Sequence, residues 1–222
     1  MANLAALNTA TAATNAALLA CRQCSRLAGF LAQVRKDNPD YHARPVLPFG
    51  VASPKLLIVG LAPGMHGANR TGRPFTGDHA GILLYKTLHK HGLANQPEGA
   101  STDDGLKLKH CRITNAVKCL PPENKPLPAE IKQCNGYLRA EIAALPQSAA
   151  LFALGNVSHQ AILRALDLKL KDYPFKHGAC YELPEGQVLF DSYHCSRYNT
   201  NTRRLTPAMF DTVVASIARH IK

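Results

Sequence analysis

Three short runs in the chain are predicted to be strands, and the first of them is continuously apolar, as is typical of a strand that is buried on both faces. The three runs are Lys55–Gly60, Arg112–Val117 and Ala149–Leu154. Between and around them, apolar residues recur every three or four positions, which is the spacing of an amphipathic helix. The segments with this spacing are Asn15–Val34, Ala80–Lys90, Leu127–Ala144, Asn156–Leu166 and the stretch from Pro207 to about Ile221, which Thr206 would cap.

Two further short strands, Tyr181–Leu183 and Gln187–Phe190, flank a turn at Pro184-Glu185-Gly186. Strands that alternate with helices predict a sheet covered by helices on both faces. We therefore predict an α/β fold with a central, mostly parallel, four-stranded sheet flanked by helices on both faces, an α/β/α sandwich. It would span residues 14–222 as a single domain, and residues 1–13, rich in Ala and Thr, are predicted to form a flexible tail.

The composition adds a strong positive charge to this picture. The chain has 222 residues, of which 46% are hydrophobic and 18% charged, and its formal net charge is +11 at pH 7. Such a charge favours a polyanionic partner, nucleic acid or a membrane surface, although it also serves solubility alone. No apolar run approaches the length of a membrane span, and the N-terminus lacks the cationic start of a secretory signal. We therefore predict a cytoplasmic protein.

Four of the seven cysteines have a spacing that indicates a metal centre. Cys21 and Cys24 form a CxxC pair, and Cys119 and Cys134 form a second, wider pair. Four thiolates suit either a 4Fe–4S cluster or zinc, and the wide second pair favours the cluster over a zinc ribbon. A redox CxxC and ordinary packing cysteines are the alternatives. The other three, Cys111, Cys180 and Cys195, lack partners at ligand spacing.

Candidate chemistry is concentrated in three segments that each follow a predicted strand. They are the Gly- and Pro-rich loop after Gly60, the segment after Thr114, and the stretch Asp191–Thr202. Because active sites in sheets of this class lie beyond the carboxyl ends of the strands, we expect the three segments to meet there.

These segments carry a resemblance to a known family. The runs GLAPGMHGANRTGRPFTGD (60–78), TNAVKCLPP (114–122) and SYHCSRYNTNTRRLT (192–206), together with the cysteines, resemble the iron–sulfur branch of the uracil-DNA glycosylase superfamily, and most of all its family 5. The resemblance covers the chain from about Cys21 to the C-terminus. It implies a base-excision enzyme that hydrolyses the N-glycosidic bond of uracil, or of another deaminated base such as hypoxanthine, after the nucleotide is flipped out of the DNA.

The resemblance also assigns roles to residues of the first segment. Gly60, Ala62 and Gly64 would surround the base, and Phe75 would stack on it. Asp78 would position or activate the attacking water. Ordinary structural roles compete with these assignments, because Phe75 also suits a hydrophobic core and Asp78 also suits the N-cap of the helix that follows.

The second and third segments complete the expected site. Asn115, whose amide carries both a donor and an acceptor, would read the Watson–Crick edge of the base, unless it only closes a strand turn. His194 would donate a hydrogen bond to the departing base. The family usually has proline after this histidine, and this chain has Cys195 instead.

The DNA contacts implied by the resemblance lie next to this site. The expected DNA-binding residues are Arg70, Arg73, Ser196, Arg197, Tyr198 and Asn199. Some would contact phosphates, and Arg197 or Tyr198 would fill the gap that the flipped nucleotide leaves. We expect a monomer associated with the nucleoid. The competing interpretations are a catalytically silent iron–sulfur DNA-binding or damage-sensing module and an iron–sulfur electron carrier.

Overall fold

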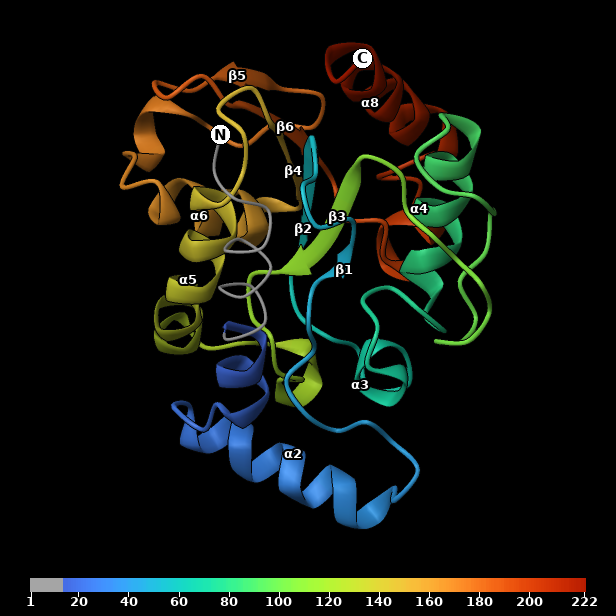
Figure 1. Cartoon of the computed structure of the whole chain (residues 1–222), viewed down its shortest axis with the longest axis vertical. Helices are drawn as coiled ribbons and strands as arrows, with labels where there is room; N and C mark the ends of the chain where they lie inside the picture. The colour runs from blue at the N-terminus through green and yellow to red at the C-terminus, as the bar shows by residue number, and fades with distance from the viewer. Residues whose placement is uncertain (1–13) are drawn as a thin grey trace.

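A mixed six-stranded sheet forms the centre of the molecule in the computed structural model, which describes residues 14–222 (Figure 1). The predicted flexible tail, residues 1–13, lies outside the described residues. The strands are β1 (Phe49–Gly50), β2 (Leu56–Gly60), β3 (Cys111–Asn115), β4 (Ala150–Leu154), β5 (Cys180–Glu182) and β6 (Val188–Ser192), in the spatial order β1-β3-β2-β4-β6-β5.

The predicted count of four strands is wrong, because each edge of the sheet carries one additional strand. β3, β2, β4 and β6 are mutually parallel, whereas β1 pairs antiparallel with β3 and β5 antiparallel with β6. The mostly parallel character of the centre is confirmed. β1 could not be predicted, since a two-residue strand after Pro48 is too short to show any periodicity.

The helices lie close to their predicted positions, except that α3 and α7 are short helices that were not predicted. They are α2 (Ser25–Asp37), α3 (Ala68–Thr71), α4 (His79–Lys90), α5 (Pro128–Ala143), α6 (Asn156–Ala165), α7 (Arg197–Asn201) and α8 (Pro207–His220), and residues 14–20 are also helical. Thr206 caps α8 as predicted, its side chain accepting a hydrogen bond from the Met209 N–H at 3.2 Å. The predicted helix Asn15–Val34 is wrong in one respect: it is interrupted at Cys21–Cys24.

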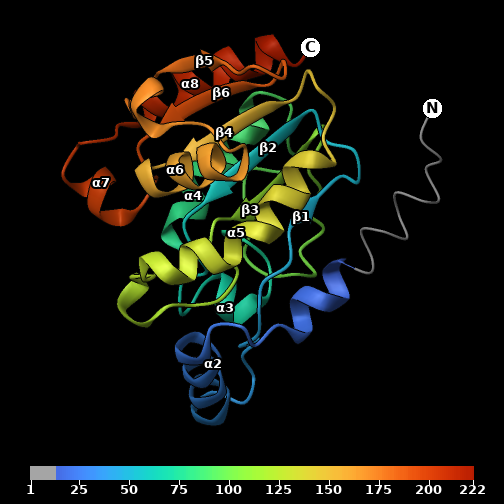
Figure 2. The same cartoon turned by 90° about the vertical axis from the view of Figure 1, so that its left-hand side faces the viewer.

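Helices cover both faces of the sheet, as predicted. α4 and α8 lie on one side and α5 and α6 on the other, and the two views in Figures 1 and 2 agree on this arrangement. Strand β2 shows why its sequence is continuously apolar. Leu56 and Ile58 pack in the core beneath α4 and α8, and Leu57 and Val59 pack in the core beneath α5 and α6.

The parallel strands bring the three candidate segments to one edge of the sheet. Gly60 and Asn115 end neighbouring strands and are paired in register. Ser192, at the end of β6, pairs with Leu154 at the end of β4. The loop after β2, the segment after β3 and the stretch after β6 therefore start from the same side of the sheet. In the described part of the chain, no helix has the length and apolar character needed to cross a bilayer.

Candidate active site

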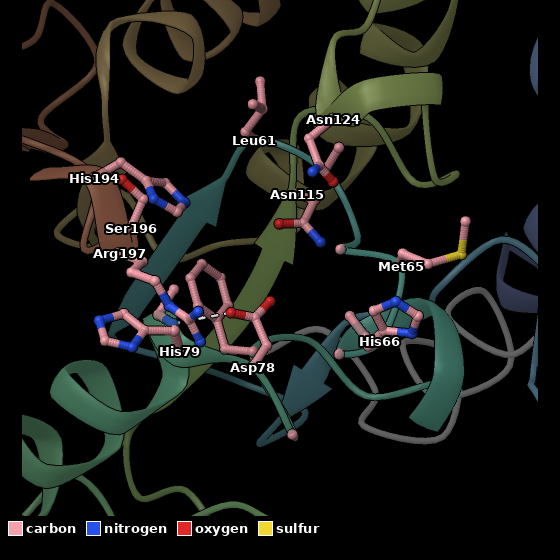
Figure 3. A pocket seen from close by; sticks show the side chains of 17 residues that line it. Leu61, Met65, His66, Asp78, His79, Asn115, Asn124, His194, Ser196 and Arg197 are labelled. Carbon is pink, nitrogen blue, oxygen red and sulfur yellow. Dashed lines mark hydrogen bonds between the residues drawn. The ribbon is translucent and has the colours of Figure 1, made fainter.

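A cavity of about 630 Å³ opens at the carboxyl ends of the central strands. The loop after β2 supplies most of its wall, including Ala62, Gly64 and Asp78. Asn115 and Asn124 line it from the second segment, and His194, Ser196 and Arg197 line it from the third (Figure 3). The structure thus brings together side chains from all three segments.

Asp78 caps helix α4 and also faces the cavity. Its Oδ1 accepts a hydrogen bond from the Ala80 N–H at 2.9 Å, so the N-cap interpretation is confirmed. Its Oδ2 lies against Gly64 and Gly67. A Cβ at Gly67 would approach this oxygen to 2.8 Å and the Asp78 Cβ to 2.3 Å. Glycine is therefore required beside this carboxylate, and the cap leaves the second oxygen available to a ligand.

Phe75 packs beside the ends of β2 and β3 at the cavity wall. Its ring is almost fully buried and stacks on His194, with the ring centroids 5.9 Å apart. A Cβ at Gly60 would lie 2.7 Å from the Phe75 ring and 2.5 Å from the Asn115 Oδ1, so Gly60 makes the space that both side chains use. Core packing is thus shown for Phe75, and part of the ring remains in the cavity wall.

Asn115 presents an amide without a partner to the cavity. The residue ends β3 and is nearly buried, and among the described residues nothing forms a hydrogen bond with its side chain. Buried polar groups in proteins almost always have a partner. The Asn115 amide instead borders the open cavity, without a hydrogen-bond partner among the described residues.

The surroundings of His194 favour the uncharged form of its imidazole. Burial lowers the pKa of its imidazole, and the negative charge of Asp78 opposes that shift only in part. The Asn199 side-chain amide donates to the His194 carbonyl at 2.8 Å, which anchors the backbone of this loop. Cys195, which follows it, is fully buried. The result is a neutral imidazole on the cavity wall, opposite Asp78 in Figure 3.

The cavity wall also contains polar side chains that the sequence did not single out, among them His66, His79 and Asn124. His66 Nδ1 lies 2.8 Å from the Tyr41 hydroxyl, and His79 Nε2 lies 3.1 Å from Thr200 Oγ1. Asn124 has a left-handed backbone, with φ at 58°. In the sequence, Asn124 is marked only by its position shortly after Pro121-Pro122. Two adjacent prolines indicate an interruption of regular secondary structure and do not point to a cavity residue.

Most of the expected DNA-contacting residues form the short helix α7 at the cavity mouth. Ser196 caps this helix by accepting from the Asn199 N–H at 3.4 Å, and Arg197 lies in the cavity wall. Tyr198 is 71% exposed, which is unusual for a large aromatic side chain. Arg70, at the end of α3, is also exposed.

Arg73 is placed elsewhere, and its predicted contact with DNA phosphate is wrong. The side chain is buried, and its guanidinium forms a two-point pair with Asp104, at 3.0 Å and 2.6 Å. It also donates to Thr76 at 2.6 Å and lies over the Phe49 ring. This pairing holds the pKa of Asp104 far below its usual range. Arg73 therefore stabilises the loop from within.

The four cysteines with metal-type spacing line a second, small cavity. Cys21, Cys24, Cys119 and Cys134 surround it, together with Tyr137. Burial raises the pKa of the Cys119 thiol to about 12, and the charges of the other three cysteines add to the shift. The chain brings these cysteines together and leaves Cys111, Cys180 and Cys195 out of the cavity. Within the described residues, no His, Cys, Asp or Glu side chains are grouped as ligands of one metal ion.

The chain is similar to known proteins over most of its length. The family model "Uracil DNA glycosylase superfamily" matches residues 47–218. A Type-5 uracil-DNA glycosylase of Thermus thermophilus is 45% identical over 207 residues, covering 91% of this chain and 94% of that protein. A Type-5 uracil-DNA glycosylase of Mycobacterium bovis is 43% identical, covering 90% and 77%. A Type-4 uracil-DNA glycosylase of Archaeoglobus fulgidus is 28% identical, covering 75% and 70%.

Proposed function

The chain belongs to the uracil-DNA glycosylase superfamily, and we propose that the cavity formed by Asp78, Asn115 and His194 is where it removes uracil from DNA. The protein is a hydrolase that acts in DNA repair. It breaks the N-glycosidic bond of uracil and leaves an abasic site in the DNA. The observation that supports this assignment is the meeting of a carboxylate, an unpartnered amide and a neutral imidazole in one cavity. Hypoxanthine and other deaminated bases are proposed as further substrates.

The cavity wall has the groups needed to hold a flipped base. The Phe75 ring provides an apolar surface on which a base stacks, and flipping enzymes commonly hold their base in this way. The free amide of Asn115 provides a donor for the O4 of uracil and an acceptor for its N3–H. Cytosine has a donor where uracil has an acceptor, so an amide in fixed orientation disfavours it.

Hydrolysis requires a placed water and a stabilised leaving group. The bond between C1′ of the sugar and the base nitrogen breaks, and the electron pair leaves with the base. The water oxygen bonds to C1′, and a proton of the water passes to the carboxylate of Asp78. His194, which is neutral, donates its N–H to the uracil O2, where negative charge develops. Asp78 Oδ2 is available for this step because Oδ1 holds the helix cap.

We propose that the cysteine cavity holds a 4Fe–4S cluster with a structural role. The fit rests on the donor set, four thiols from separate parts of the chain around one cavity. In a cluster each thiolate binds a different iron, so the four sulfurs need not converge on one point as they do around zinc. When bound, the cluster would tie the Cys21–Cys24 segment to the segment after β3 and to α5.

The proposed activity is tested with a duplex oligonucleotide that carries one uracil. Alkali should cleave the strand only at the uracil after incubation with the protein, and a matched duplex with thymine should remain intact. No step of the mechanism uses a divalent cation, so the rate should persist in EDTA. Cleavage of undamaged DNA, or cleavage that needs magnesium, would contradict the assignment.

We predict that the purified protein is yellow-brown and contains iron, with broad absorbance near roughly 400 nm. Replacing Cys119 with Ser should abolish this colour and lower the melting temperature, because the cluster cross-links two distant parts of the chain. Cys180→Ser is the matched control, since Cys180 is exposed and outside the cavity. One zinc and no iron per chain would show that the cluster assignment is wrong.

The affinity for DNA should depend mainly on contacts between charged side chains and phosphates. Tyr198 should instead act after binding, when the base is flipped. Each phosphate contact adds about −0.9 to the slope of log affinity against log salt on duplex DNA. Replacing Arg197 with Ala should reduce that slope. Tyr198→Ala should keep it while slowing base flipping, because an exposed ring at the cavity mouth is placed to fill the gap in the stack. Fluorescence anisotropy and a 2-aminopurine flipping signal separate the two. Affinity that is independent of salt would refute the first part, and an unchanged flipping signal in Tyr198→Ala would refute the second.

A further inference from the structure

A fully buried lysine lies between the cysteine cavity and the strand that carries Asn115. Lys118 follows Asn115 by three positions and immediately precedes Cys119, and its side chain is 0% exposed. Lysine is almost never fully buried unless its charge is paired. The proposed hydrolysis gives Lys118 no role, so the burial of this lysine needs another explanation.

The side chain of Lys118 joins the end of β3 to α5. Its ammonium group donates to the hydroxyl of Thr114 and, at 2.7 Å, to Oε1 of Glu141. Thr114 is the residue directly before Asn115 in β3, and Glu141 lies in the last turns of α5. The position of the strand end is thus fixed against the helix at the residue next to the base-reading amide.

The backbone of Lys118 connects the same point to the cysteines. Its N–H donates to the sulfur of Cys134 at 3.3 Å, and its carbonyl accepts from the Val46 N–H at 2.8 Å. Lys118 therefore contacts a cysteine of the proposed cluster site through its backbone and the recognition strand through its side chain.

Stability alone does not account for this pair. The second oxygen of Glu141, Oε2, is buried and has no hydrogen-bond partner. Removing two charges from water is costly, and replacing a buried ion pair by apolar residues of similar volume is often neutral or stabilising. A buried pair such as Lys118 and Glu141 is therefore weak evidence for a purely stabilising role.

We propose that Lys118 is a positioning residue that sets the orientation of the Asn115 amide through Thr114, and that it links this amide to the cysteine cavity. The inference rests on the proposed function of the main cavity. Its contribution is geometric: Lys118 does not line the main cavity, and it acts on the substrate only through the strand end that it holds.

A double-mutant cycle tests whether Lys118 acts through Asn115. The double replacement Lys118→Met with Glu141→Leu removes both charges at once and keeps the volume apolar. We expect it to lower the single-turnover rate on uracil by about 10-fold to 100-fold, the range for a displaced binding group. In an Asn115→Ala background the same replacement should change the rate by less than about 2-fold, because residues acting through one another are not additive.

Thr114→Val gives a second route to the same answer if the double replacement does not fold. It keeps the shape of Thr114 and removes only the contact with Lys118, so it should show the same loss and the same dependence on Asn115. Thr87→Val is the matched control: the hydroxyl of that buried threonine donates to the Leu83 carbonyl of its own helix, so its replacement should leave the rate unchanged. Circular dichroism and the cluster absorbance report folding independently of activity.

The outcomes distinguish this inference from the proposed function. Equal losses with and without Asn115, or no loss at all, would overturn the positioning role of Lys118. A wild-type protein that folds and contains iron but releases no uracil would instead overturn the proposed function.

Discussion

Replacing Asp78 with Asn should lower the single-turnover rate of uracil release by about 10²–10⁴-fold, the usual range for a positioned acid–base group. Asp78 is the carboxylate in the cavity wall, and its Oδ2 faces the cavity between Gly64 and Gly67. Asparagine has nearly the same shape but cannot take a proton from water. The rate under single-turnover conditions measures the chemical step apart from product release.

This replacement separates the two roles of Asp78 because asparagine is as good an N-cap as aspartate. The side-chain oxygen of asparagine still accepts from the Ala80 N–H, so α4 should remain capped and the melting temperature should change little. Asp211→Asn is the matched control. Asp211 pairs with Lys90 and His91 on the surface, far from the chemistry proposed here, and its loss should leave the rate unchanged.

A second variant examines the placement of the same carboxylate. Gly67→Ala keeps Asp78 but puts a methyl group 2.3 Å from its Cβ, so the carboxylate must move. It should therefore also slow uracil release. Near-normal rates in both variants would show that Asp78 only caps the helix, and the water would then be placed by the backbone or by His194.

The parallel core of the fold could be predicted because its sequence signals are local. A strand such as Leu56–Gly60, covered on both faces, needs apolar residues along its length, and the glycine that ends it marks the turn into the site. Because active sites in such sheets lie beyond the carboxyl ends of the strands, Asp78, Asn115 and His194 were then predicted to lie close together. All three line one cavity in the structure.

The features that were missed depend on contacts between distant parts of the chain. Arg73 looks like a surface arginine in its loop, and only the approach of Asp104, 31 residues later, buries it. The helix expected at Asn15–Val34 keeps its apolar spacing across Cys21–Cys24, so periodicity alone could not show the break there. Lys118 gave no signal because its partner Glu141 lies on another element.

Replacing His194 with Ala should slow the chemical step by about 10²–10³-fold, the loss expected for one hydrogen bond to a developing anion. His194 lies on the cavity wall and stacks on Phe75, so its removal takes away the donor and part of the wall. His194→Gln restores a donor without a titrating group and should recover part of the rate. His89→Ala, at an exposed position near the end of α4, is the control.

The pH dependence of the rate distinguishes a neutral from a charged donor at His194. Because burial lowers the pKa of His194, the imidazole is already neutral below the usual histidine range. If the neutral form donates, the rate should not increase on acidification through about pH 6.5, the ordinary histidine value. The unfolded chain binds this proton more readily than the folded protein does, so acidification should also lower stability, and His194→Ala should weaken that dependence. A rate that rises as the pH falls, and no longer does so in His194→Gln, would show instead that the imidazolium stabilises the departing base.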